Sequence, residues 1–359
     1  MTKKAVFILF YDKPTPRQNL LARAVEKRGY ETSFIAWNRK GGAVEREAQA
    51  MGGRDVKWVN VKAPTWSVKI IFALGAYYRA VLRALKDSGE PEIVFITHLA
   101  ILPLALFIRG SKKVYDSAEM YAFGMSLYFG ALAPVARGFI NVIEGVLARF
   151  VDGVTVIDTK EGQLARHFER WNGNVAVLWN TPDKADDPDE EKTRALENGI
   201  YKGKKAVSFV GGLMKEKGLR VALEAVSAVK KRHPDVLFVF IGPMKDDARE
   251  INRLVESLGV GENIRFFEFM PYREMLAHAK NAMVGLALFQ PVLHYGQISS
   301  GTARKYFTYM QAGAPIIGPV FGEAGEILRE ADCGVLVDTS DPQAVADAII
   351  RLFDNPAEA

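Results

Sequence analysis

Short runs of apolar residues alternate with amphipathic stretches along the chain. The runs have the length of buried strands, and the stretches between them repeat apolar residues every three or four positions. This alternation predicts parallel sheets with helices on both faces. In the first half the predicted strands are 5–11, 32–36, 56–61, 93–97, 114–115 and 154–157, and the predicted helices are 17–28, 68–86, 134–150 and 160–171.

The alternation stops in a polar segment and then starts again. Residues 180–192, NTPDKADDPDEEK, contain two prolines and six acidic residues, a composition typical of a linker. We therefore predict a first domain at 1–180, a linker at 181–203 and a second domain at 204–359. The second domain has predicted strands at 206–210, 237–241, 264–267, 284–288, 315–318 and 334–337, and predicted helices at 219–232, 246–258, 302–312, 322–330 and 342–353. The fold class is α/β, with two doubly wound Rossmann-like domains facing a cleft.

Composition indicates the cellular compartment in which the protein is found. The chain has 359 residues and one cysteine, Cys333, so no intrachain disulfide can form and a reducing compartment is expected. The apolar run near the N-terminus is too short for a signal peptide. Because no segment has about 18 uninterrupted apolar residues, we expect no membrane-spanning helix and a cytoplasmic location.

Charge is divided unevenly between the halves. Residues 1–180 hold 25 Lys and Arg against 16 Asp and Glu, a net +9, whereas residues 181–359 hold 22 against 26, a net −4. The first half should therefore prefer an anionic partner. In helix 68–86, Lys69, Arg79, Arg83 and Lys86 fall on one side and apolar residues fill the other. That pattern favours docking on the inner face of an anionic membrane, and a core helix with its basic side in water is an equal alternative.

Glycine and basic residues gather at two predicted strand-to-helix turns. Residues 209–218, FVGGLMKEKG, follow a predicted strand, and Lys217 lies just before a predicted helix. Residues 299–305, SSGTARK, lead into helix 302–312 and end in Arg304 and Lys305. Backbone N–H groups at such turns and the positive end of the helix dipole attract phosphate. An ordinary turn with solvated basic side chains is the alternative for each.

The order of these and other segments resembles that of retaining glycosyltransferases of the GT-B fold, family four. Each segment alone is weakly specific, whereas their shared order along nearly the whole chain is strongly specific. The segments are YDSAE at 115–119, IEGVLARFVD at 143–152, NTPD at 180–183, FVGGLMKEKG at 209–218, LFVFIGP at 237–243, IRFFEFMPY at 264–272, AMVGLALFQP at 282–291, KYFTYMQAGAP at 305–315, GEAGE at 322–326 and GVLVD at 334–338.

The resemblance implies a nucleotide-sugar donor bound by the second domain. The residues that it assigns to the donor diphosphate are Gly211, Gly212, Lys217, Gly301, Thr302 and Lys305. Those that it assigns to the donor sugar or nucleotide are Ser300, Thr308, Pro243, Met270 and His294. For His294, a solvent-exposed loop histidine is the stronger alternative.

Several positions depart from the family pattern. Ser300 and Thr308 stand where the family has two glutamates, and a threonine cannot make the charge-assisted bond that a carboxylate makes to ribose hydroxyls. Gly212 stands where an arginine is frequent. Ala118 replaces a histidine near the reaction centre, although Glu119 beside it remains.

In the first domain, Glu119 is the predicted catalytic residue, which would position the acceptor or stabilise developing charge. His98 ends a predicted strand and is a candidate acceptor contact, with a structural histidine as an equal alternative. The five histidines form no HxxxH or HExxH pair, so we expect no metal and no cofactor besides the nucleotide-sugar substrate. Nucleic acid is not an expected partner.

The predicted function is transfer of a sugar, with retention, from a nucleotide-sugar donor to the hydroxyl of a lipid-linked, membrane-proximal or saccharide acceptor. The replacements at Ser300, Thr308 and Ala118 leave open a catalytically impaired nucleotide-sugar-binding partner protein. A sugar-nucleotide epimerase on the same fold is a third alternative.

Overall fold

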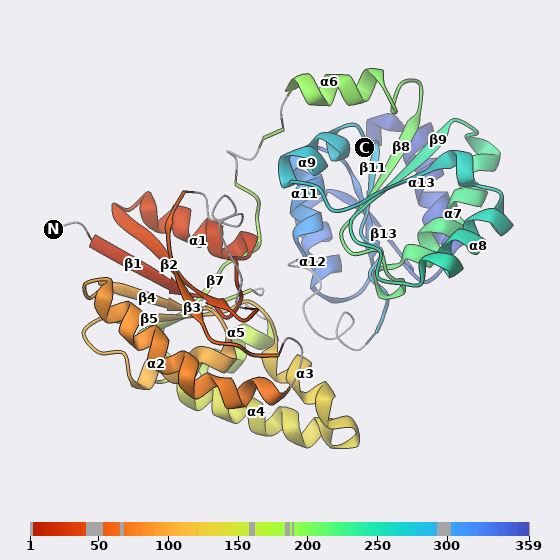
Figure 1. Ribbon diagram of the computed structural model, residues 1–359. Coiled ribbons are helices and arrows are strands. Elements are labelled where there is room, and N and C mark those ends of the chain that lie inside the picture. Colours follow the sequence, from red (N-terminus) through yellow and green to blue (C-terminus); the bar gives the residue numbers. More distant parts are fainter. Residues whose placement is uncertain are drawn as a thin grey trace. The chain divides into compact units, whose positions relative to one another are not determined.

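Two parallel sheets organise the computed structural model, which describes residues 3–40, 53–64, 68–157, 162–183, 187–188, 190–292 and 303–358. The chain divides into two units, Met1–Trp179 and Asn180–Ala359 (Figure 1). Each unit is a sheet covered by helices on both faces, which confirms the predicted doubly wound α/β class.

The sheet of the first unit has seven described strands in the order β3-β2-β1-β4-β5-β6-β7, all parallel. Its central strands are apolar throughout because both of their faces are covered. The sequence prediction missed β7, a strand of three residues at the sheet edge. The strands are β1 (Lys3–Ile8), β2 (Tyr30–Asn38), β3 (Asp55–Asn60), β4 (Ile93–Ile96), β5 (Lys112–Ser117), β6 (Gly153–Val156) and β7 (Val175–Val177).

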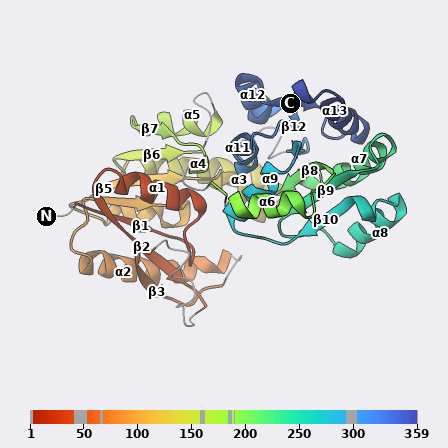
Figure 2. The ribbon, with the colours of Figure 1, turned by 90° about the horizontal axis from the view of Figure 1, so that it is seen from above.

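Most helices of the first unit pack on one face of its sheet. α2, η3, α4 and α5 share a core with β1, β4, β5 and β6, whereas α1 packs on the opposite face. In Figure 2, β1 and β2 accordingly lie between α1 and α2. The helices are α1 (Pro16–Glu26), η2 (Val68–Ile70), α2 (Ile71–Asp87), η3 (Leu99–Leu106), α3 (Tyr121–Ser126), η4 (Leu127–Leu132), α4 (Ala133–Ala148) and α5 (Gln163–Glu169).

The second unit has six described strands in the order β10-β9-β8-β11-β12-β13, all parallel. β9 at its centre is buried at every position. The strands are β8 (Lys205–Val210), β9 (Val236–Ile241), β10 (Ile264–Phe267), β11 (Val284–Leu286), β12 (Ile316–Pro319) and β13 (Gly334–Val337).

Helices cover both faces of this second sheet. α7, α8 and α13 share one core, and α6, α9, α11 and α12 pack on the other face. The helices are α6 (Glu190–Asn198), η6 (Lys215–Lys217), α7 (Leu219–Arg232), α8 (Ala248–Leu258), η7 (Gly261–Asn263), α9 (Tyr272–Lys280), α11 (Arg304–Ala312), α12 (Gly322–Ala331), α13 (Pro342–Asp354) and η8 (Pro356–Glu358).

Part of the segment predicted as a linker is folded. Helix α6 contacts α9, and the Asn281 side chain donates a hydrogen bond of 3.2 Å to the Thr193 carbonyl. Lys192 also pairs with Glu274. Residues 190–198 are therefore part of the second unit, because α6 packs against α9. The sequence pattern predicts neither of these two helices.

One helical stretch bears on the expectation that the chain has no membrane-spanning helix. Among the described residues, the helical stretch Tyr128–Ala148 is long and apolar enough to cross a membrane by length and composition. It contains two charges, Arg137 and Glu144, and is interrupted at Gly130, whose φ of 53° and ψ of −123° are not helical. Regular α-helix begins only at Ala133.

Candidate functional site

In the second unit, the loop after β8 touches the loop after β9. A Cβ on Gly242 would lie 2.1 Å from the Gly211 carbonyl oxygen, and both residues have positive φ, so glycine is required for this approach. The Leu213 N–H donates to the Pro243 carbonyl and the Lys245 N–H donates to the Leu213 carbonyl, each at 2.9 Å. The predicted residues Gly211, Gly212 and Pro243 are thus brought together at the carboxyl edge of the sheet, where ligands of such folds bind.

Three lysines converge on this glycine turn. The Lys217 Nζ lies 3.6 Å and the Lys245 Cγ 3.8 Å from the position that a Cβ would take on Gly212. The Lys305 Cε lies 3.7 Å from the corresponding position on Gly211. Lys217 and Lys305 were predicted, whereas Lys245 was missed because only the pairing of the two loops brings it here.

Lys305 is the most unusual of the three. Its ammonium group is buried, has no hydrogen-bond partner among the described residues, and lies 4.4 Å from the centroid of the Phe209 ring and 5.0 Å from that of Phe289. Burial, and then the charge of Lys217, lowers the pKa of Lys305 well below its usual range. Burial, and then the charge of Lys245, lowers the pKa of Lys217. Such a cluster is suited to a multiply charged anion.

Two helices begin at this turn without a capping side chain. The N-cap of α7 is Gly218 and that of α11 is Ala303, and neither has a side-chain oxygen that could accept a hydrogen bond from the first-turn N–H groups. A Cβ on Gly218 would lie 2.3 Å from the Leu288 carbonyl oxygen, so only glycine allows α7 to begin so close to the strand next to β8. The N–H groups at the start of each helix and the helix dipoles add to the attraction for phosphate.

The other residues assigned to the donor differ in how well the structure supports a contact with it. Met270 is half-buried after β10, at the same edge of the sheet. Thr308 is fully buried, and its hydroxyl donates to the Arg304 carbonyl at 3.1 Å, so it has no surface to offer a ligand. The structure therefore gives no support to Thr308 as a ribose contact. Ser300, Gly301, Thr302 and His294 lie outside the described residues.

In the first unit, His98 is part of an aromatic cluster at the carboxyl edge of the sheet. Its ring stacks on Phe10 with centroids 3.9 Å apart and contacts Tyr121 at 4.3 Å. The His98 Nδ1 accepts a hydrogen bond of 2.9 Å from the Ala100 N–H, and burial lowers the pKa of His98 to about 3. The imidazole is therefore neutral, with its proton on Nε2, and can donate one hydrogen bond.

Glu119 follows β5 and borders the same cluster. Partial burial of its carboxyl group raises the pKa of Glu119, and the charge of Glu119 contributes, after burial, to the raised pKa values of Tyr11 and Tyr121. The Tyr11 ring lies 6.0 Å from that of His98. The two residues predicted for the acceptor side are thus brought into one neighbourhood by strands β1, β4 and β5.

Arg39 supplies a cation here that the sequence prediction missed. Its guanidinium lies 4.1 Å from the centroid of the Phe10 ring and 4.5 Å from that of Trp37, and it donates a hydrogen bond to the Phe10 carbonyl. Its Nε is buried with no hydrogen-bond partner in the described ranges, and burial lowers its pKa. No sequence pattern distinguishes this arginine from a surface one.

Two buried pairs hold the surrounding loops. Arg17 forms an ion pair with Asp116 at 2.8 Å, and the Thr155 hydroxyl donates to Asp116 at 2.7 Å, which joins α1 to β5 and β6. The Tyr115 hydroxyl donates to Glu144 at 2.6 Å, and burial raises the pKa of Glu144 to about 7. These contacts place the chain that leads from β5 into Glu119.

The basic residues predicted to meet a membrane are exposed. Lys69 precedes α2, and Arg79, Arg83 and Lys86 follow one side of it, while the other side of the helix packs into the core through Tyr77, Val81 and Leu85. α2 is therefore a core helix with a basic outer side, which fits either of the alternatives stated from the sequence.

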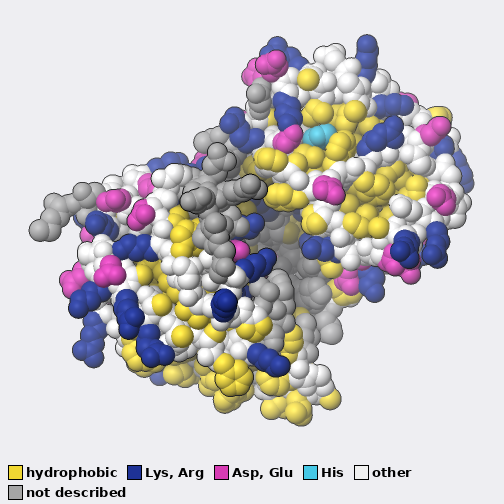
Figure 3. Space-filling model, in the orientation of Figure 1, with side chains coloured by type: hydrophobic (Ala, Val, Ile, Leu, Met, Phe, Trp, Pro, Cys, Tyr) yellow, Lys and Arg dark blue, Asp and Glu magenta, His cyan; other side chains and the backbone are white. Residues whose placement is uncertain are grey.

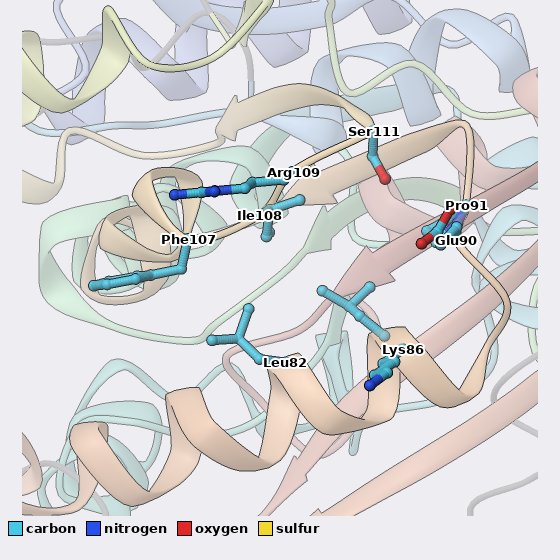
Figure 4. A pocket seen from close by; sticks show the side chains of 9 residues that line it. Leu82, Lys86, Glu90, Pro91, Phe107, Ile108, Arg109 and Ser111 are labelled. Carbon is cyan, nitrogen blue, oxygen red and sulfur yellow. The ribbon is translucent and has the colours of Figure 1, made fainter.

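A shallow hollow of about 150 Å³ lies between the end of α2 and the chain before β5. Figure 4 shows Leu82 and Lys86 on one side of it, with Phe107, Arg109 and Ser111 opposite. It lies near the amino ends of β4 and β5, at the opposite edge from His98 and Glu119, so we do not assign it to the reaction. In the described part of the chain no three His, Cys, Asp or Glu side chains cluster closely enough to hold a metal ion, and the metal-free site stays a prediction.

Comparison with known proteins shows which proteins the chain is similar to. Residues 190–359 match the family described as glycosyl transferases group 1. Spore coat protein SA of Bacillus subtilis is 30% identical over 167 residues, 44% of this chain and 42% of that protein. The GDP-mannose-dependent alpha-(1-6)-phosphatidylinositol monomannoside mannosyltransferase of Mycolicibacterium smegmatis is 25% identical over 284 residues, 76% of this chain and 70% of that protein. The chain thus spans about two fifths of the first of these relatives.

Among solved structures, HepE of Anabaena in complex with UDP superposes with a TM-score of 0.72 at 15% identity, covering 99% of this chain and 91% of that one. At this identity the match shows the fold alone. The two Rossmann-like units are those of the GT-B glycosyltransferase fold.

Proposed function

From the match of residues 190–359 to the glycosyl transferases group 1, we propose that the chain is a retaining glycosyltransferase. It transfers a sugar from a nucleotide-sugar donor to the hydroxyl of a lipid-linked or membrane-proximal acceptor. The single observation that supports this most strongly is the buried amine of Lys305 beside the Gly211–Gly212 turn, because a buried cation is costly unless an anion pairs with it, and a bound diphosphate would supply that anion.

The second unit binds the leaving group. Lys217, Lys245 and Lys305 neutralise the negative charge that grows on the diphosphate as the bond between the sugar C1 and the phosphate oxygen breaks. N–H groups at the start of α7 and α11 add fixed dipoles. Groups that are already oriented before the reaction stabilise such charge at little reorganisation cost, and this is usually the largest contribution to catalysis.

The first unit binds the acceptor. His98 donates through Nε2–H, the half-exposed Tyr11 offers aromatic surface to a sugar ring, and Glu119 positions the acceptor hydroxyl. The proton of that hydroxyl passes to the departing phosphate oxygen while the acceptor oxygen bonds to C1 on the same face. The products are a nucleoside diphosphate and the glycosylated acceptor, with retained configuration.

The acceptor is proposed to lie at the inner face of a membrane. One relative supports this choice in part: the protein of Mycolicibacterium smegmatis is named as a phosphatidylinositol monomannoside mannosyltransferase. The net +9 of residues 1–180 is consistent with an anionic surface. The enzyme would then be cytoplasmic and peripheral to the membrane.

A nucleotide-sugar-binding partner protein without activity is the second candidate. The specific observation in its favour is the burial of Thr308, which leaves the ribose without the contact that a glutamate would supply at this position. Loss of that bond weakens donor placement without removing the diphosphate site.

The test is donor binding followed by transfer. Calorimetry with UDP, GDP, ADP and dTDP identifies the base, and the matching radiolabelled nucleotide sugars are then offered with a membrane lipid extract. A labelled lipid product with retained anomeric configuration supports the proposal. Binding without either transfer or donor hydrolysis would favour the inactive partner, and no binding of any nucleoside diphosphate would refute both.

A further inference from the structure

Exposed hydrophobic side chains are concentrated on one layer of the first unit. Of the 21 large hydrophobic residues exposed in the described ranges, 14 belong to the helical layer formed by α2, η3, α3, η4 and α4 or directly follow it. Monomeric proteins rarely expose apolar patches beyond about 300–600 Å² unless the patch binds something. The 14 residues, called here the apolar face, are Ile71, Phe72, Leu106, Phe107, Met125, Tyr128, Phe129, Leu132, Val135, Phe139, Val142, Ile143, Val146 and Phe150.

The apolar face is most regular along α4. Its exposed members recur every three or four residues from Leu132 to Phe150, so they form one stripe along the outer side of the helix. Val135 is 72% and Phe139 67% exposed. At 1.5 Å per residue the stripe is roughly 27 Å long. Over this length its outer side has one exposed charge, Arg149, at the end of the helix.

Basic side chains border the apolar face. α2 and α4 both contact η3 and pack on the same face of the sheet, so their outer sides belong to one surface. Figure 3 shows hydrophobic side chains gathered along the lower edge of the first unit, over α2 and α4, with Lys and Arg side chains beside them. The exposed basic side chains of α2 are Arg79, Arg83 and Lys86. An apolar stripe flanked by cations is complementary to a bilayer with anionic headgroups.

α4 lies along such a surface and does not cross it. On its inner side Glu144 is bonded to Tyr115 of β5. A Cβ on Gly145 would lie 2.3 Å from the Trp171 ring, and Ala148 is fully buried. The regular helix, Ala133–Ala148, is also shorter than the ~20 residues that a bilayer core requires. The inner side is thus fixed to the unit and only the outer stripe is available to lipid.

We propose that the apolar face of the first unit inserts shallowly into an anionic membrane, with α4 parallel to the surface and the basic side of α2 on the headgroups. A lipid surface fits better than a protein partner, because protein interfaces need about one hydrogen bond per 100–200 Å², and the α4 stripe offers no hydrogen-bonding side chain before Arg149. The inference deepens the proposed function, since it supplies the surface on which a lipid-linked acceptor is met.

The test is sedimentation of the full chain with vesicles of phosphatidylcholine alone or with added phosphatidylglycerol. The parent should bind the mixed vesicles at low salt and retain a weaker, salt-resistant component. The double variant Phe139→Asn/Val146→Asn should bind both vesicle types about tenfold or more weakly, because each substitution removes partly exposed apolar surface from the insertion. Phe269→Asn/Val320→Asn, two exposed residues of the second unit, is the matched control and should bind like the parent.

The electrostatic part has a separate variant. Lys69, Arg79, Arg83 and Lys86 changed together to Gln should lower binding to the mixed vesicles by about a hundredfold at low salt and leave binding to neutral vesicles unchanged. A Trp at position 139, Phe139→Trp, should shift its fluorescence to the blue on mixed vesicles, whereas Phe269→Trp should not.

Three results would overturn the inference: a parent that stays in the supernatant with every vesicle, stripe variants that bind like the parent, or a parent dimer that the stripe variants dissociate. The last would assign the apolar face to a second copy of the chain. Thermal unfolding verifies that each variant is folded. Donor binding, measured without vesicles, is expected to be equal in the parent and all variants. A parent that binds donor but no vesicle would therefore refute the membrane surface and leave the proposed transferase standing.

Discussion

Replacing Lys305 with methionine should have two opposite effects, because the same ammonium group destabilises the free protein and binds the ligand. Methionine matches the length of the lysine stem and keeps the contacts with the Phe209 and Phe289 rings. The substitution removes a buried charge that has no hydrogen-bond partner among the described residues. The free protein should therefore become more stable and the protein bound to a nucleoside diphosphate less so.

The magnitudes follow from the burial. A buried donor left without a partner costs about 1–3 kcal/mol, and more when it is charged, so Lys305→Met should raise the free energy of unfolding of the second unit by at least about that amount. A charge-assisted hydrogen bond contributes about 1.5–3 kcal/mol, so the affinity for the nucleoside diphosphate should fall by roughly 10- to 150-fold.

Both effects depend on pH in a defined direction. The pKa of Lys305 is lower in the folded protein than in the unfolded chain, so between the two values the unfolded chain binds more protons and stability rises with pH. Ligand binding restores the charge, so the affinity of the parent should fall as pH rises through that window. Lys305→Met should flatten both profiles.

The assays are urea unfolding and calorimetry with the nucleoside diphosphate that the parent binds, each from pH 6 to 10. Lys231→Met is the matched control, because Lys231 is exposed at the end of α7, and it should change neither quantity. If Lys305→Met leaves stability and affinity at the parent values, the buried amine is not part of an anion site and the assignment of the second unit to the donor loses its main support.

Further predictions concern single side chains. Lys245→Met should weaken the same diphosphate by about 1.5 kcal/mol in calorimetry, because Lys245 borders Gly212; an unchanged affinity would restrict the site to the other two lysines. Glu119→Gln should lower kcat by about a hundredfold or more with donor affinity unchanged, and a parallel loss of donor binding would instead indicate misfolding. The pKa of Glu144 is raised to about 7 on folding, so the stability that its protonated form contributes is present below about pH 4.5 and is lost as pH rises through 7. In urea unfolding, Glu144→Gln should flatten this fall in stability with pH. An unaltered pH dependence would contradict the raised pKa.

The sequence pattern predicts the sheets well because parallel strands buried on both faces are continuous apolar runs. β8, β9 and β10 begin and end within one residue of their predicted bounds. It fails for short elements whose stability comes from neighbours. β7 has three residues and is held by its register with β6, and α9 packs between α6 and α11 with only a short apolar side. Local composition cannot reveal such elements, since tertiary contacts decide them.

The sequence likewise predicts only part of the donor site. Gly211, Gly212 and Lys217 are contiguous in sequence, so their joint role is visible in a turn between a strand and a helix. Lys245 reaches the same place only because the loops after β8 and β9 pair through Leu213. The acceptor site is harder still to predict from sequence. Arg39 and His98 follow different strands and come together only when the sheet forms.

α4 marks a limit of periodicity as evidence. The spacing from Leu132 to Phe150 identifies an apolar side of a helix, and the usual conclusion is that this side faces the core. In the structure the core side is the other one, where Gly145 and Ala148 permit close packing and Glu144 is satisfied by Tyr115. A helix side made of small residues and one hydrogen-bonded carboxylate can be buried as completely as a side made of large apolar residues, provided that the neighbouring elements pack closely against it. A periodic pattern therefore identifies which residues share a side of a helix. Only the packing of the small residues in the structure shows which side faces the core and which side is exposed to a partner.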